Sequence, residues 1–144
     1  MPDASSRHSV TSRRAPEPVG AFPHARKVGD LLFLSGIGPR QRGTEEIPGV
    51  SLDGRGNVVS YDIAMQCRAV FENVLIVLED AGAAWKDIVD VTVFLTDMKE
   101  DFSTFNGIYA EYFKDNQPTR TTVEVGCLPT PINIELKVIA VLPG

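Results

Sequence analysis

The sequence predicts an α+β fold in which two helices cover one face of a mixed sheet. Short apolar or alternating runs predict strands, and two longer runs with apolar residues every three or four positions predict helices. A chain of 144 residues is long enough for one domain with a single core. We expect that domain over residues 21–144, with order starting near Phe22, after a flexible N-terminal arm over residues 1–20.

The predicted sheet starts with a hairpin. Residues 30–36 form an apolar run that ends in Ser35-Gly36, Val28 belongs to the partner strand, and Gly29-Asp30 forms the turn. Residues 41–57 are polar and contain several Gly and Pro residues, which predicts a long loop. Loops of this length in a compact domain are often functional.

Two helices are predicted over residues 60–81 and 101–113. The first has a regular apolar stripe, and Gly82 stands where a C-terminal cap belongs. The second carries five aromatic side chains on one face. β-Branched and alternating residues predict the remaining strands over residues 88–96, 121–125 and 132–142.

Composition argues against several classes of protein. The net charge of −5 and the pI near 5.0 do not favour a nucleic-acid binder, which usually has a basic face. No apolar run approaches the length of a membrane span. Cys67 and Cys127 are too few for a disulfide framework, so we expect a reducing, cytoplasmic compartment.

No known motif for a metal, phosphate or nucleophile is present. The sequence contains no G-x-S-x-G, G-x-x-x-x-G-K-[ST] or H-E-x-x-H pattern, and its histidines are His8 and His24 alone. Gly36-Ile37-Gly38 lacks the third glycine of a dinucleotide-binding turn. The sequence therefore excludes the protein families that these motifs mark, and a zinc site would need carboxylate ligands in addition to His and Cys.

Two polar residues interrupt apolar patterns. Asn106 falls within the apolar face of the second helix, where its amide either clamps a neighbouring loop or contacts a ligand. Glu135 stands between Ile134 and Leu136 and is either solvated at an edge or held in a cleft. In a cleft its pKa would rise, which suits proton transfer near neutral pH.

Three cations are further candidates. Arg120 stands at the entrance to a strand, and arginine binds carboxylates bidentately. Arg40 follows the Ser35-Gly36 turn, and His24 follows Pro23. Surface residues of these types are common, so the residues alone leave both a structural and a functional interpretation open.

Together these residues resemble the RidA (YjgF) family. The first motif is Pro23-His24 followed by Gly29-Asp30 and a strand that ends in Ser35-Gly36. The middle motif, F-x-x-x-N-x-x-Y-x-x-x-F, is matched over residues 102–113. The last motif runs from Pro118-Thr119-Arg120 through Leu128-Pro129 to Ile134-Glu135. The resemblance covers residue 22 to the C-terminus, and the order and spacing of the motifs make it specific.

Within that family the chain resembles the 2-aminomuconate deaminases. Typical members have tyrosine at the position of His24 and cysteine at that of Thr122. Arg40 and the segments Arg120-Thr121-Thr122-Val123 and Leu128-Pro129-Thr130-Pro131 support the narrower resemblance.

The resemblance implies a chorismate-mutase-like homotrimer with clefts between subunits and no cofactor. It also implies hydrolysis of 2-aminomuconate, through its imine, to 4-oxalocrotonate and ammonia. Arg120 would clamp the carboxylate beside the nitrogen, and Glu135 would hold water and shuttle protons. Arg40 is a candidate for the second carboxylate, with His24 as a proton donor or hydrogen-bonding group. Substrate or water would be positioned by Ser35, Gly36, Asn106 and Thr122.

Two rival interpretations stay open. One is a broad deaminase that clears reactive imines formed from amino acids. The other is a non-catalytic trimer that binds keto acids or a protein partner, for which Glu135 would have no use. Ribonuclease or translation-inhibitor activity, which has been attributed to the family, finds little support in an acidic chain.

Overall fold

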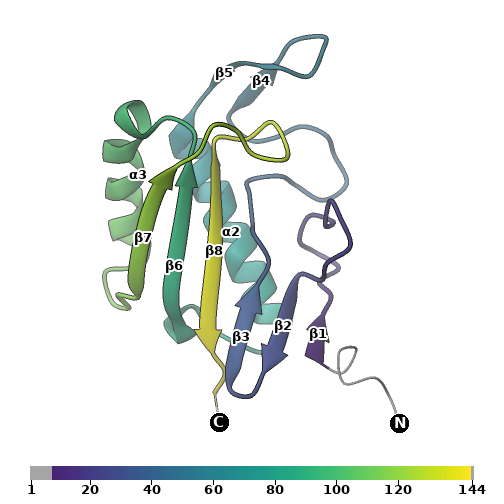
Figure 1. Ribbon diagram of the computed structural model, residues 1–144, viewed down its shortest axis with the longest axis vertical. Coiled ribbons are helices and arrows are strands. Elements are labelled where there is room, and N and C mark those ends of the chain that lie inside the picture. The colour runs from purple at the N-terminus through teal and green to yellow at the C-terminus, as the bar shows by residue number, and fades with distance from the viewer. Residues whose placement is uncertain (1–7, 144) are drawn as a thin grey trace.

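A computed structural model describes residues 8–143 as one six-stranded sheet with two long helices packed on one side (Figure 1). The strand order is β1-β2-β3-β8-β6-β7, and a separate two-stranded ribbon, β4-β5, projects from one end. The α+β fold predicted from the sequence is confirmed. The elements are β1 (Ser9–Val10), β2 (Ala25–Val28), β3 (Leu31–Leu34), β4 (Val50–Leu52), β5 (Val58–Tyr61), α2 (Ile63–Asp80), η1 (Trp85–Asp87), β6 (Ile88–Leu95), α3 (Met98–Tyr112), β7 (Thr119–Glu124) and β8 (Ile134–Val141).

The sheet is mixed, as expected. β8 lies between β3 and β6 and is antiparallel to both, and β6 and β7 are parallel neighbours joined through α3. β3 and β6, which are connected through α2, form a split β-α-β unit in which the last strand, β8, is inserted between them. This central strand carries Glu135, so the residue stands in the middle of the sheet.

Most predicted elements lie where expected, but several bounds differ: α3 starts at Met98 rather than at residue 101, and β7 starts at Thr119 rather than at residue 121. The hairpin turn at Gly29 is present, and its φ of 58° explains the glycine. The predicted first helix starts later, because Ser60 and Tyr61 pair with β4 and Asp62 caps α2 by accepting from the Met65 N–H. The predicted long loop contains β4, so only part of it lacks regular structure.

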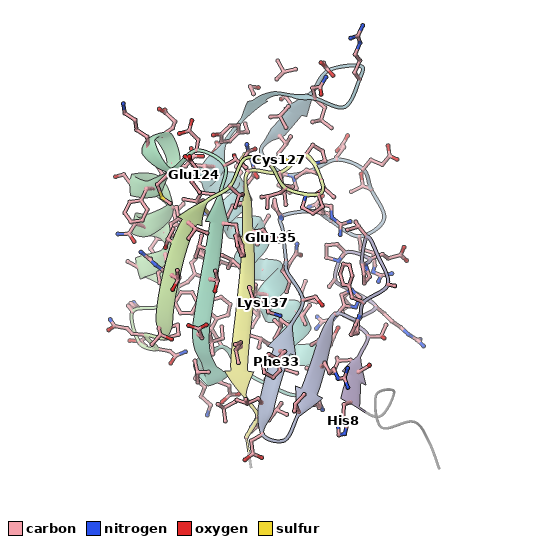
Figure 2. The ribbon with its side chains drawn as sticks, in the orientation of Figure 1. His8, Phe33, Glu124, Cys127, Glu135 and Lys137 are labelled. Carbon is pink, nitrogen blue, oxygen red and sulfur yellow. The ribbon has the colours of Figure 1, made fainter. Side chains whose placement is uncertain are left out.

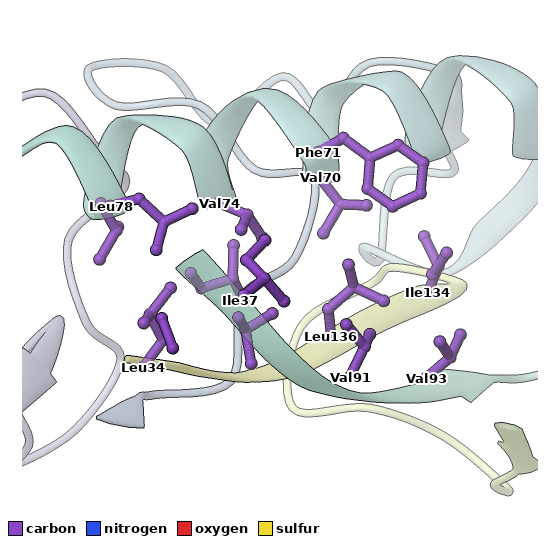
Figure 3. Packing of buried hydrophobic residues seen from close by; sticks show 14 of the residues in the cluster. Leu34, Ile37, Val70, Phe71, Val74, Leu78, Val91, Val93, Ile134 and Leu136 are labelled. Atoms are coloured by element: carbon purple, nitrogen blue, oxygen red, sulfur yellow. The ribbon is translucent and has the colours of Figure 1, made fainter. Parts of the chain in front are cut away.

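The core lies between the helices and the sheet. Figure 3 shows Val70 and Val74 of α2 above Val91 and Val93 of β6 and Leu136 of β8. Alternate residues of β6 and β8 are buried against the helices, and the residues between them are half-buried on the open face. This alternation decides on which side of the sheet each candidate side chain lies.

The predicted start of the ordered domain near Phe22 is too late. From Ser9 onward the arm belongs to the fold, because β1 pairs with β2. The Ser12 hydroxyl donates to Asp80, and the Arg14 guanidinium binds the same carboxylate at 2.7 Å. These partners lie more than sixty positions away in the sequence, so local patterns gave no indication of them. Residues 1–7 lie outside the described chain.

Candidate active site

Glu135 lies on the open face of the sheet, the side away from α2 and α3. Its strand neighbours Ile134 and Leu136 are fully buried toward the helices, so alternation turns Glu135 to the other face. Figure 2 shows Glu135 and Lys137 following each other on the same strand. The interpretation of Glu135 as a solvated edge residue is wrong, since the strand is central and the side chain is half-buried.

The Glu135 carboxylate has no hydrogen bond or ion pair within residues 8–143. Burial raises its pKa above the ordinary glutamate value, and the charge of Arg40 opposes this with a smaller effect. A half-buried carboxylate with a raised pKa and free oxygens is suited to accept and return a proton near neutral pH.

Glu135 opens into a cavity of ≈ 330 Å³. Ser35, Gly36 and Arg40 line the same cavity, so the structure brings these predicted residues together with Glu135. A Cβ at Gly36 would lie 2.7 Å from Oε2 of Glu135, so only glycine lets the carboxylate approach the backbone here. The Ser35 hydroxyl donates to the carbonyl of Pro23, which lines the same cavity.

Arg40 is held at the rim of this cavity by two contacts. Its guanidinium donates to the carbonyl of Glu17 at 2.8 Å, and its own carbonyl accepts from the Asn73 amide at 2.7 Å. Asn73, which sequence analysis did not single out, also donates to the carbonyl of Gly38 at 2.8 Å. This buried amide on α2 thereby fixes the segment that follows Gly36. Because Asn73 is a polar residue inside the apolar stripe of the helix, the sequence alone could have indicated that it has a specific partner.

His24 also lines the cavity. Its Nδ1 accepts from the Ser12 N–H at 3.0 Å, so its Nε2 carries the hydrogen that is donated to the carbonyl of Pro16 at 2.8 Å. Both ring nitrogens are therefore occupied by contacts within the chain, and the role of His24 toward a substrate, as a proton donor or a hydrogen-bonding group, stays a prediction. His24 fastens the arm that forms the apolar side of the cavity, where Pro16, Pro18, Val19 and Phe22 lie.

Arg120 lies on the other face of the sheet. It pairs in register with Val91, which is fully buried toward the helices, and it stacks over the ring of Tyr109 with its Cζ 4.6 Å from the centroid. Among residues 8–143 no carboxylate pairs with it. Its guanidinium therefore keeps its donors for an anion. Tyr109, Lys114 and Gln117 line a cavity of ≈ 320 Å³ with it.

Two further predicted residues belong to the side of Arg120. Thr122 pairs with the buried Val93 and shares the face of Arg120 two positions away. Asn106 is exposed, so its predicted burial within the apolar face is wrong. It lies at the edge of that face, one turn from the half-buried Phe102 and Tyr109, whose rings Arg120 overlies. The Tyr109 hydroxyl is buried without a partner in the described chain.

The predicted site is thus divided into two groups on opposite faces of one sheet. We call Glu135, Ser35, Gly36 and Arg40 the glutamate half-site, and Arg120, Thr122, Asn106 and Tyr109 the arginine half-site. β6 separates β7 from β8, and the register places Arg120 beside Val91 but Glu135 beside Phe94. One chain therefore does not place Glu135 and Arg120 around the same small molecule.

Lys137 was not predicted. It lies two residues after Glu135 on the same face and donates to the carbonyl of Leu34, where β3 turns away from β8. Burial lowers its pKa.

No group of three or more His, Cys, Asp and Glu side chains in residues 8–143 is arranged to hold a metal ion. Within the same range, no helix is both long and apolar enough to cross a membrane.

The fold and the two half-sites define a small α+β protein with a divided polar site. Residues 12–142 match the family described as Endoribonuclease L-PSP, and the chain belongs to this family. The resemblance to RidA (YjgF) proteins is confirmed, since the YjgF gene product of Escherichia coli matches with a TM-score of 0.78 and 32% identity over 92% of this chain and 97% of that one.

Two further relatives extend the comparison. A RutC family protein of Pyrococcus abyssi is 38% identical over 91% of this chain and 94% of its own length. TdcF of Escherichia coli, whose name proposes a reactive intermediate deaminase, is 34% identical over 92% of this chain and 95% of its own length. The crystal structure of TdcF with bound serine has a TM-score of 0.79 and 33% identity and covers 94% of this chain and 98% of that one. None of these relatives is described as a 2-aminomuconate deaminase.

Proposed function

We propose that this protein is a hydrolase that deaminates reactive imines and enamines of 2-amino acids. The observation that carries the proposal is a pair of groups without an ionic partner in residues 8–143, a half-buried carboxylate with a raised pKa and an arginine that stacks on aromatic rings. A 2-imino acid needs both, a cation for its carboxylate and an acid-base group for its nitrogen. The name of TdcF and its serine complex point to the same class of ligand.

The chemistry needs water and proton transfer. An enamine takes a proton at carbon and becomes the imine, and the C=N bond then adds water to give a tetrahedral carbinolamine. The C–N bond breaks, the nitrogen leaves as ammonia, and the C=O bond forms. Glu135 would accept a proton from the attacking water and deliver it to the departing nitrogen. Arg120 would bind the carboxylate and orient the imine carbon.

A site of this kind has to be built between two chains. Glu135 and Arg120 lie on opposite faces of the sheet, so the glutamate half-site of one subunit would meet the arginine half-site of the next. The homotrimer predicted from the resemblance provides such a repeating contact. The open sheet face also exposes or half-buries apolar residues that assembly would cover, namely Leu31, Phe33, Phe94, Val123, Ile139 and Val141.

The narrower proposal is that the substrate is 2-aminomuconate. Arg40 favours it, because a second cation lies in the cavity of Glu135 and a muconate carries a second carboxylate. The apolar residues of the arm line the same cavity as Arg40 and Glu135, and they suit an unsaturated carbon chain. The relatives support the broad deaminase more strongly than this specialisation, so the broad activity is our main proposal.

Ammonia release tests the activity. The wild type is supplied with 2-iminopropionate, formed in place from alanine by an amino acid oxidase, and separately with freshly made 2-aminomuconate. Faster hydrolysis than buffer on the first substrate supports the broad deaminase, and a preference for the second supports the specialised one. If neither reacts faster than in buffer, the deaminase proposal is wrong, and a keto-acid-binding protein becomes the better interpretation.

Subunit mixing tests the divided site. At a substrate concentration far below the KM of Arg120→Met, the Arg120→Met and Glu135→Gln chains are each expected to have little activity alone. Reassembled together in equal amounts, they should recover about a quarter of wild-type activity, because one in four contacts then joins an intact Glu135 to an intact Arg120. A site built within one chain would recover nothing.

A further inference from the structure

The start of β8 is fixed by a buried polar network that the proposed reaction does not use directly. The side-chain oxygen of Asn133 accepts from Nε2 of Gln66 at 2.9 Å, and its backbone N–H donates to Oε1 of the same glutamine at 2.9 Å. Its Nδ2 donates to the hydroxyl of Thr96 at 2.9 Å. The Thr96 N–H donates back to the carbonyl of Asn133.

The network joins three elements at one point. Gln66 lies on α2 and is fully buried, Thr96 follows the last residue of β6, and Asn133 precedes the first residue of β8. The two side-chain contacts between Gln66 and Asn133 are buried, where hydrogen bonds are strong and costly to leave unmade, and the contact with Thr96 is partly buried. An apolar core in the same place would hold the elements together without fixing their register.

Glu135 depends on this point for its position. Its carboxylate has no hydrogen bond or ion pair in the described chain, so its position follows from the backbone of β8, which pairs with β6 at Phe94, and from packing against Gly36. On the C-terminal side that backbone is held by the bridge between Leu136 and Ile37. On the N-terminal side Ile134 is the last residue in the sheet, and Asn133 is the next anchor.

We propose that Asn133, Gln66 and Thr96 are positioning residues of the active site, which hold the start of β8 so that the Glu135 carboxylate stays over Gly36. They act through Glu135 and do not touch the substrate. The same anchor holds the end of the loop that carries Pro129 and Thr130 to the cavity rim. This inference rests on the proposed function for its effect on rate, but the placement of Glu135 is measurable without turnover.

The test compares an apolar pair with its single variants. Gln66→Met or Asn133→Leu alone leaves a buried amide side chain unpaired and should lower Tm. Gln66→Met with Asn133→Leu removes both amide side chains, leaves only the backbone N–H of residue 133 and the Thr96 hydroxyl without these partners, and should recover part of that loss. We expect the pair to stay at least tenfold below wild type in kcat on 2-iminopropionate, because the carboxylate is no longer fixed. KM should change by less than about threefold, because Arg120 still binds the carboxylate.

Tyr61→Phe is the matched control. It removes the hydrogen bond of Tyr61 to the buried Asp101 and should lower Tm without changing kcat, because neither residue lies near Glu135 in the sheet or in its cavity. If the apolar pair recovers kcat together with Tm, the network is only structural and the inference is overturned.

A second measurement keeps the test independent of catalysis. Carbon-13 NMR titration of the Glu135 carboxyl, assigned by its loss in Glu135→Gln, reports how far that group is from water. In the apolar pair its pKa should move down toward the ordinary glutamate value, and an unchanged pKa would overturn the inference. A shifted pKa in a protein that hydrolyses no imine would instead leave the positioning role intact and remove the proposed function.

Discussion

The two half-sites differ in how the fold holds an unpaired charge. Arg120 lies half-buried over the rings of Phe102, Phe105 and Tyr109, and these aromatic faces attract its cation. Glu135 has no comparable support, because burial raises its pKa and its cavity is largely apolar on the side of the arm. The arginine half-site is therefore suited to bind an anion at rest, and the glutamate half-site is suited to change its protonation state.

The largest expected effect separates these two roles. Glu135→Gln should lower kcat by roughly 10²–10⁴-fold, because the amide keeps the shape but cannot exchange the proton. Arg120→Met should mainly raise KM, by roughly 10–100-fold, because charged hydrogen bonds to the carboxylate are lost. Steady-state kinetics on 2-iminopropionate measures both. Equal changes in kcat and KM for the two variants would remove the distinction between the half-sites.

Gly36 provides a smaller and more local test of the glutamate half-site. In Gly36→Ala the new methyl group would meet the Glu135 carboxylate, which is the flexible end of a side chain and moves aside at little cost to stability. We expect kcat to fall by roughly 10–100-fold with little change in Tm.

Gly54→Ala is the control for this change, because nothing lies within contact of a Cβ at that position. It should alter neither kcat nor Tm. A loss of Tm in Gly36→Ala that matches its loss of kcat would mean that Gly36 serves folding rather than the placement of the carboxylate.

Arg40 connects the glutamate half-site to the choice of substrate. Arg40→Met removes a cation that opposes the rise in the pKa of Glu135, so that pKa should move further up. If Glu135 must be ionised to act, the acidic limb of the kcat/KM profile then shifts to higher pH. KM should rise several-fold more for 2-aminomuconate than for 2-iminopropionate. This difference corresponds roughly to the free energy of one exposed ion pair. Equal increases for both substrates would exclude Arg40 as the second carboxylate site.

The sequence predicted the elements better than the site. Helices and strands such as residues 88–95 follow from local periodicity, which one sequence contains. The ordered arm depends on contacts such as Ser12 with Asp80, and these appear only after folding. The opposite faces of Arg120 and Glu135 depend on register, since a shift by one residue would reverse either side chain. The resemblance therefore supplied candidate residues, whose roles stay predictions, without their arrangement.

The smallest expected effect concerns stability, and it follows from the raised pKa of Glu135. A carboxyl group whose pKa is higher in the folded state contributes stability below its unfolded pKa, and this contribution is lost as pH rises through the folded value. At neutral pH the charged Glu135 is therefore a cost that Glu135→Gln removes. We expect Tm to rise by about 1–4 °C at neutral pH and the gain to vanish at acidic pH.

The corresponding change in the arginine half-site should have the opposite sign. Arg120→Met removes a cation that three aromatic rings stabilise, so Tm should stay the same or fall at every pH. Glu72→Gln, on the exposed side of α2, controls for loss of a surface charge. Thermal unfolding across pH measures all three variants. A fall in Tm for Glu135→Gln would show that this carboxylate stabilises the fold. The proposed contrast, in which the Glu135 anion destabilises the folded state and the Arg120 cation stabilises it, would then be wrong.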